Sequence, residues 1–156
     1  FSACGGAALY RLSAFRKVGG FDEKFFMYVE DIDLGFRLQL SGSPCRFVPE
    51  AIAEHVGSGT TGKNSAFNVY HGHRNLTAAY LKNMPAGLLA ITLPFHIIAS
   101  LVTVIVMSLR GKASIICRAK LDALLNVPAY LAQRDQVKIT VSSRYIWKLL
   151  KKWPLR

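Results

Sequence analysis

The run of 24 residues from Ala86 to Leu109 constrains the fold most, because it contains no Lys, Arg, Asp or Glu. A helix of this length can cross a hydrocarbon core of about 30 Å. The polar side chains in the run are His96, two threonines and two serines. The sequence therefore predicts a hydrophobic, membrane-associated helix, and the alternative is a helix buried in the core of a larger soluble protein.

The uneven charge of the chain limits how this helix meets a membrane. Residues 110–156 carry eleven Lys or Arg and two acids, whereas residues 1–54 carry six Lys or Arg and seven acids. So basic a tail prefers the cytoplasmic face. If the acidic first third is also cytoplasmic, one complete crossing would put one of the two on the wrong side. We therefore expect a re-entrant or in-plane helix with a basic anchor, at the cytoplasmic face of the cell membrane.

The rest of the chain alternates short apolar segments with helical patterns. Small or β-branched apolar residues predict strands at residues 1–11, 45–48 and 52–56. Apolar residues at helical spacing predict helices at residues 14–18, 30–41 and 65–82. Mixed basic and apolar residues predict amphipathic, surface-bound segments at residues 113–133 and 138–156. We expect an α/β domain, a hydrophobic helix and a basic amphipathic tail over residues 1–83, 84–111 and 112–156.

The densest cluster of chemically reactive side chains is Glu30, Asp31 and Asp33, at the start of the helix predicted over residues 30–41. Free backbone N–H groups and the helix dipole stabilise anions at such a position. Simple capping needs one acid rather than three, so the alternative is a general base or a cation site. Glu30 and Asp33 are three residues apart and share a helix face, while Asp31 points elsewhere.

The string from Gly19 to Gly42, GGFDEKFFMYVEDIDLGFRLQLSG, resembles the acceptor-side half of a family 2 glycosyltransferase of the rhamnosyltransferase-like kind. The resemblance covers residues 1–83 and continues in register through further blocks. These are Phe47-Val48-Pro49-Glu50-Ala51, His55 with Gly57-Ser58-Gly59, Tyr70 with Arg74-Asn75, and Lys82-Asn83.

The resemblance implies a partial GT-A fold, which is a Rossmann-like α/β sandwich, and an inverting sugar transfer in bacterial surface polysaccharide synthesis. The donor would be a nucleotide sugar, and the acceptor a saccharide or a lipid-linked saccharide. Asp31 would be the general base that takes the proton of the acceptor hydroxyl, because a sugar hydroxyl is a poor nucleophile at neutral pH. Glu30, Asp33 and Asp22 would orient the base or the acceptor.

The resemblance also implies residues for the donor. His55 would help to hold Mg²⁺ or Mn²⁺ or the diphosphate, although a histidine at a strand end often has only a packing role. Ser58 and Thr60 lie on a loop that would close over the donor. Arg74 would pair with a donor or lipid phosphate, and its alternative is a solvated helix charge.

Neither a nucleotide-binding strand nor a separate metal-binding D-x-D precedes Phe1 in this sequence. We therefore expect a C-terminal, acceptor-side fragment that is inactive by itself and whose activity belongs to the intact parent. The alternative is a non-catalytic, membrane-binding remnant of a truncated transferase. Nucleic-acid binding would rest on charge alone, since no nucleic-acid motif accompanies it, and we expect no such partner.

Overall fold

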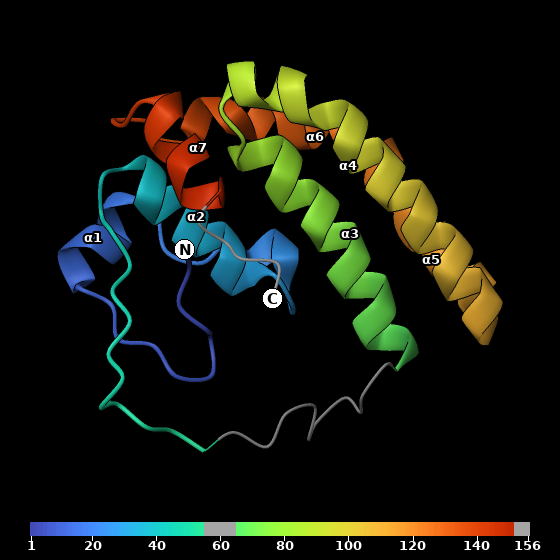
Figure 1. The fold of residues 1–156 in the computed structure, drawn as a ribbon, viewed down its shortest axis with the longest axis horizontal. Helices are drawn as coiled ribbons and strands as arrows, with labels where there is room; N and C mark the ends of the chain where they lie inside the picture. The colour runs from blue at the N-terminus through green and yellow to red at the C-terminus, as the bar shows by residue number, and fades with distance from the viewer. Residues whose placement is uncertain (55–64, 152–156) are drawn as a thin grey trace.

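The computed structural model describes residues 1–54 and 65–151, and Figure 1 shows that they form a helical assembly. The longer elements, in chain order, are α1 (Leu12–Lys17), α2 (Glu30–Leu40), α3 (Ala66–Asn83), α4 (Ala86–Met107), α5 (Ala113–Leu125), α6 (Val127–Ala132) and α7 (Ser143–Lys151). Three short turns of helix connect them, η1 (Glu23–Phe25), η2 (Ser108–Lys112) and η3 (Gln133–Gln136).

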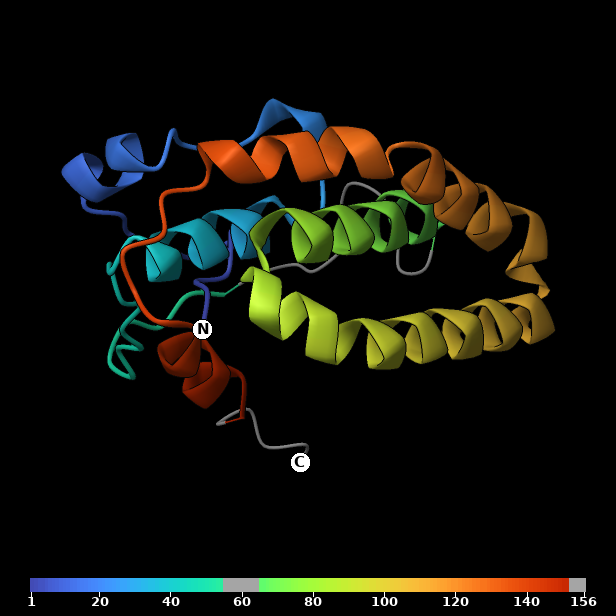
Figure 2. The ribbon, with the colours of Figure 1, turned by 90° about the horizontal axis from the view of Figure 1, so that it is seen from above.

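Helix α3 lies at the centre of the assembly. It packs against α2, α5 and α6, and α4 lies along its other side (Figure 2). Helix α4 leads away from the end of α3, and α5 returns antiparallel to it. The reversal occurs at Gly111, whose φ of 74° is a left-handed conformation that glycine adopts without steric cost.

The α/β expectation is wrong for the described residues, which contain helices and no strand. Residues 1–10, 45–48 and 52–54 are irregular, and the remaining two residues of the last expected strand lie outside the described part. Leu9, Phe47 and Ile52 are exposed rather than packed in a sheet. An apolar segment becomes a strand only when its backbone pairs with another strand, and none of these segments has such a partner here.

The helix predictions are confirmed with small shifts at their ends. Helix α2 begins at Glu30 and ends at Leu40, and Gly42 follows with a φ of 80°. Helix α3 begins after Ser65, whose side chain accepts a hydrogen bond from the Asn68 N–H at 3.1 Å. Helix α1 begins two residues earlier than expected, at Leu12.

Two apolar clusters hold the helices together. Phe36 and Leu40 of α2 pack with Met84, Leu88 and the fully buried Ile146 of α7. Val69, Met107 and Ile116 join α3 to the α4–α5 hairpin. The basic tail is therefore packed against α2 and the start of α4 rather than detached from them.

Candidate active site at the start of α2

The carboxylate of Asp33 is the centre of a buried ionic network between α2 and α3. Asp33 is 0% exposed. Its Oδ2 accepts from Arg37 Nη2 at 2.6 Å and Nε at 2.9 Å, and its Oδ1 lies 3.0 Å from Lys82 Nζ and 2.7 Å from Asn83 Nδ2. Lys82 Nζ also lies 2.7 Å from Asp22 Oδ2. Asp33 therefore joins elements that are about fifty residues apart in the sequence.

The loop that enters α2 is held in an unfavourable backbone conformation. Phe26, Tyr28 and Val29 have φ values of 58°, 68° and 72°, a region that side chains with a Cβ rarely adopt. The side chain of Asn75, which is 1% exposed, donates to the carbonyl oxygens of Phe25, Met27 and Tyr28 at 2.7, 2.9 and 2.9 Å. Strain of this kind persists only when the surroundings fix the conformation, and the Asn75 amide does so here.

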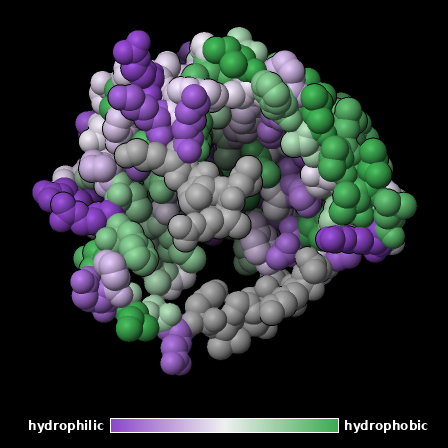
Figure 3. Space-filling view, viewed as in Figure 1, coloured by the Kyte–Doolittle hydropathy of each residue, from purple (hydrophilic) through white to green (hydrophobic). Residues whose placement is uncertain are grey.

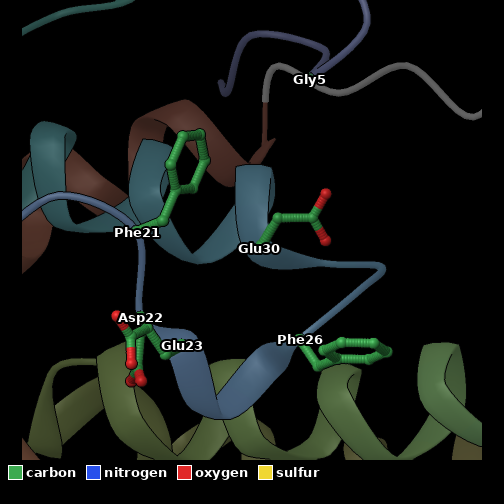
Figure 4. Close-up of a pocket in the computed structure, with 6 residues that line it drawn as sticks. All are labelled: Gly5, Phe21, Asp22, Glu23, Phe26 and Glu30. Atoms are coloured by element: carbon green, nitrogen blue, oxygen red, sulfur yellow. The ribbon is translucent and has the colours of Figure 1, made fainter.

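An open cavity of about 470 Å³ lies in front of this loop. Its lining residues are Gly5, Phe21, Asp22, Glu23, Phe26 and Glu30. Figure 4 shows the Glu30 carboxylate extending from the first turn of α2 into the space between Gly5 and Phe26. One oxygen of Glu30, Oε2, is buried without a hydrogen-bond partner among the described residues. A carboxylate in this state can accept a hydrogen bond from a ligand hydroxyl.

Asp31 lies beside the cavity and not in its lining. Its Oδ2 accepts from the backbone N–H of Gly5 at 2.9 Å, and its Oδ1 from that of Ile32 at 2.8 Å. The N-terminal segment is positioned for this contact by its close approach to α2, where a Cβ on Gly35 would lie 2.3 Å from the Cβ of Ser2. Each carboxylate oxygen keeps a second lone pair for a further donor.

Asp22 combines a cavity position with a structural bond to Lys82. Burial alone would raise the pKa of the Asp22 carboxyl. The hydrogen bonds from Lys82 Nζ and from the Lys24 N–H outweigh burial and hold the pKa below its usual value. Asp22 is therefore ionised at neutral pH and can accept, but not donate, a hydrogen bond.

Sequence reasoning missed Tyr10 and underused Asn75. The Tyr10 hydroxyl is buried without a partner among the described residues, and its pKa is raised by burial and then by the negative charge of Asp31. It therefore stays protonated and remains a hydrogen-bond donor near the acids. Tyr10 lies in a segment predicted as a strand, so no pattern singled it out. The only sequence signal for Asn75 was its place in the Arg74-Asn75 block of the family resemblance.

Arg74 lies on the other side of the η1 loop from the cavity. Its Nε donates to Asn75 Oδ1 at 3.0 Å and its Nη2 to the Lys24 carbonyl at 3.1 Å, and its guanidinium faces the Tyr70 ring at 5.7 Å. In this arrangement Arg74 fixes the orientation of the Asn75 amide. The other donor-side predictions, His55, Ser58 and Thr60, lie outside the described residues.

The cation prediction depends on the same undescribed segment. Within residues 1–54 and 65–151, no three carboxylate, histidine or cysteine side chains converge as a metal ion requires. Asp22, Glu23 and Glu30 line one cavity without forming such a group. The described residues therefore do not supply a cation site on their own.

A sequence model of the Glycosyl transferase family group 2 matches residues 1–133, so the chain belongs to this family. The family resemblance that the sequence showed over residues 1–83 is thereby confirmed.

The curated relatives refine this result. The N-acetylglucosaminyl-diphospho-decaprenol L-rhamnosyltransferase of Mycobacterium tuberculosis (strain H37Rv) is 41% identical over 83 residues, which are 53% of this chain and 27% of that protein. Rhamnosyltransferase WbbL of Escherichia coli (strain K12) is 49% identical over 53 residues, which are 33% of this chain and 20% of that protein. The chain thus spans about a quarter or less of the curated relatives it matches. No solved structure matches it significantly.

Proposed function

We propose that this chain supplies the acceptor side of an enzyme that transfers a sugar from a nucleotide-sugar donor to an acceptor hydroxyl in bacterial polysaccharide synthesis. The observation that carries the proposal is the acidic first turn of α2 beside an open cavity, in a chain of the Glycosyl transferase family group 2. The relatives' names support a deoxyhexose donor and, from the decaprenol-linked case, a lipid-linked acceptor. The basic tail of the chain supports a working place at the cytoplasmic face of the membrane.

In this proposal Asp31 is the general base of an inverting displacement. The acceptor hydroxyl gives its proton to an Asp31 carboxylate oxygen as the hydroxyl oxygen attacks the anomeric carbon, and the donor diphosphate leaves from the opposite face. The backbone N–H groups of Gly5 and Ile32 hold the carboxylate in place, and a positioned base of this kind contributes about 10²–10⁴-fold to the rate.

The neighbouring side chains then bind the acceptor. Glu30 extends into the cavity with a free carboxylate oxygen and accepts from a second sugar hydroxyl. Asp22 accepts at the opposite side of the cavity. Asp33 positions these groups through α2 and α3 without touching the sugar, because it is fully buried and already holds Arg37, Lys82 and Asn83.

The donor side depends on residues that the structure does not describe. We propose that His55, Ser58 and Thr60 contact the diphosphate, with Mg²⁺ or Mn²⁺ offsetting its charge. Because the described residues supply no cation site, we derive no step through the metal. Arg74 contributes by fixing Asn75 and the η1 loop.

The test is sugar transfer by the native protein carrying Asp31→Asn, with Glu50→Gln as the matched control. Glu50 is an exposed carboxylate that lies ten residues beyond the end of α2 and does not line the cavity. We expect Asp31→Asn to lower kcat by about 10²-fold or more with little change in KM, and Glu50→Gln to leave both unchanged. Near-normal transfer by a folded Asp31→Asn protein would reject the base assignment. If Glu30→Gln instead removed turnover, the proton would be assigned to Glu30.

A further inference from the structure

Helix α4 turns its polar side chains inward and its apolar side chains outward, which is the reverse of a surface helix in a water-soluble protein. Its polar side chains Thr92, His96 and Ser100 recur every four residues and face the interior. Tyr80 Oη lies 2.8 Å from Thr92 Oγ1, the Tyr80 and His96 rings stack at 4.0 Å, and Lys120 Nζ donates to Ser100 Oγ at 3.2 Å. The inward face is completed by Leu88 and Met107 at its two ends.

The outward face of α4 is apolar along its whole length. Its stripe of exposed side chains follows helical spacing and comprises Ile91, Phe95, Ile98, Val102, Ile105 and, just beyond the helix, Leu109. Each is at least half exposed. Figure 3 shows a large hydrophobic surface gathered on the right, over α4, while hydrophilic and hydrophobic residues are mixed elsewhere in that view. In water a helix normally turns its apolar side inward, so this face is built for an apolar neighbour.

Basic side chains flank both ends of this apolar face. Arg110 lies three residues beyond the end of α4. Helix α7 contacts the beginning of α4 and carries the exposed side chains of Arg144, Lys148 and Lys151. Trp147 of α7 lies under Lys151 Nζ at 5.0 Å. An apolar stripe between two groups of cations matches hydrocarbon bordered by anionic headgroups.

The packing of α5 decides how α4 meets that surface. Helix α5 runs antiparallel beside α4 and carries Arg118, Lys120 and Asp122 in its middle, and α3 adds His73 and Arg74 alongside. A crossing α4 would draw these charged helices into the hydrocarbon, where charged side chains are strongly unfavourable. A helix lying in the plane exposes only its outer stripe to lipid and keeps both cationic ends at headgroup level.

We infer that the outer face of α4 docks the protein in the plane of an anionic membrane, immersed in one leaflet. The inference is linked to the proposed function in one respect, because the docked face would place the transferase site at the membrane surface. It specifies which side of the molecule faces the lipid and leaves the polar α3–α4–α5 seam, formed by Thr77, Tyr80, Thr92, His96, Ser100 and Lys120, inside the protein.

Binding to vesicles tests the docking face without any sugar substrate, so it is independent of the transferase proposal. The probe is phosphatidylcholine vesicles with and without phosphatidylglycerol, and the variants are Ile98→Glu and its matched control Ile52→Glu. Both isoleucines are exposed, but Ile52 lies in an irregular segment away from α4. We expect Ile98→Glu to weaken binding to both vesicles by about tenfold or more and Ile52→Glu to leave it unchanged, with helix content the same in all three proteins.

The basic end formed by α7 is tested by a double variant that carries both Lys148→Gln and Lys151→Gln. Binding to anionic vesicles should fall about fivefold for each charge removed and should weaken with salt, whereas binding to neutral vesicles should not change. Equal losses for Ile98→Glu and Ile52→Glu, or no loss for either, would overturn the docking face. So would a finding that Ile98→Glu only separates a dimer of this chain, which would assign the face to a second copy.

The in-plane orientation is tested by measuring how deeply a dye at each of three α4 positions lies in the bilayer, by fluorescence quenching. Single cysteines at Ile91, Ile98 and Ile105 would carry an environment-sensitive dye, in a chain whose exposed Cys4, Cys45 and Cys117 are changed to serine. Similar, shallow depths at all three positions support the in-plane helix. A deep central position, with the Ile105 position reached by impermeant quencher only from the opposite side of the bilayer, would show a crossing helix and overturn it.

Discussion

At the C-terminal end of α3, Lys82 is buried between Asp22 and Asp33, whereas in the middle of the same helix Thr77 faces Lys120, a half-buried lysine that contacts hydroxyl groups. The first lysine has two carboxylate partners, and the second has none among the described residues. Burial accordingly lowers the pKa of Lys120. One helix therefore serves two environments, a paired ionic core beside the candidate active site and a polar seam behind the apolar outer face of α4.

The comparison teaches how the chain separates charge from the apolar hairpin. Where charges are buried, they are paired with partners in α2 and in the loop before it. Where α3 meets α4 and α5, the contacts use hydroxyls and stacked rings, and the ions Lys120 and Asp122 of α5 bond to hydroxyl groups there. The outer face of α4 remains apolar.

The largest effect on stability should follow from Asp33→Asn, which disrupts the paired ionic core around Lys82. The substitution leaves Arg37 and Lys82 buried with part of their charge uncompensated, and we expect the free energy of unfolding to fall by about 3–5 kcal/mol. Urea unfolding measures it, with the exposed Asp135→Asn as the control. A loss below about 1 kcal/mol would mean that the network has little role in holding α2 to α3.

A matched pair of substitutions, Lys82→Met and Lys120→Met, sharpens the comparison directly. Lys82→Met removes the partner of Asp22 and one partner of Asp33, and should cost about 2–3 kcal/mol. Lys120→Met removes a half-buried cation that has no carboxylate partner among the described residues, and should range from neutral to about 1 kcal/mol more stable. Equal destabilisation by both, in the same unfolding experiment, would remove the distinction between the two regions.

The smallest effect that we expect is on the pH dependence of stability, through His73 in the polar α3–α4–α5 seam. The pKa of His73 is lowered by burial and then by the charge of Lys120, so the folded state favours the neutral ring. Stability from this group is complete above pH about 6.5 and is lost as the pH falls toward the lowered pKa. His73→Gln should reduce the loss of stability between pH 7 and 5, and Lys120→Met should reduce it less. An identical pH profile for His73→Gln and the unchanged chain would contradict this.

The sequence predicted the helices well because their signals are local. The helical spacing of apolar residues over residues 30–41 and 65–82 and the uncharged run all report the conformation of nearby residues. The α/β fold was wrong because residues 1–11 and 45–48 lack a paired backbone here, and pairing is not a local property. Tyr10 was missed for a related reason, since its approach to Asp31 depends on how the N-terminal segment packs on Gly35.

The sequence by itself determined the membership of the family, the acidic start of α2 and the apolar character of α4, because these depend on residue types at fixed spacing. Only the tertiary structure decided that Asp33 is a buried partner of Lys82 while Glu30 reaches the cavity, although both are acids on one turn of helix. It alone also decided that Thr92, His96 and Ser100 face inward and the isoleucines outward. Which side of a helix is covered depends on the helices that pack against it. An uncharged sequence does not specify where those neighbouring helices lie.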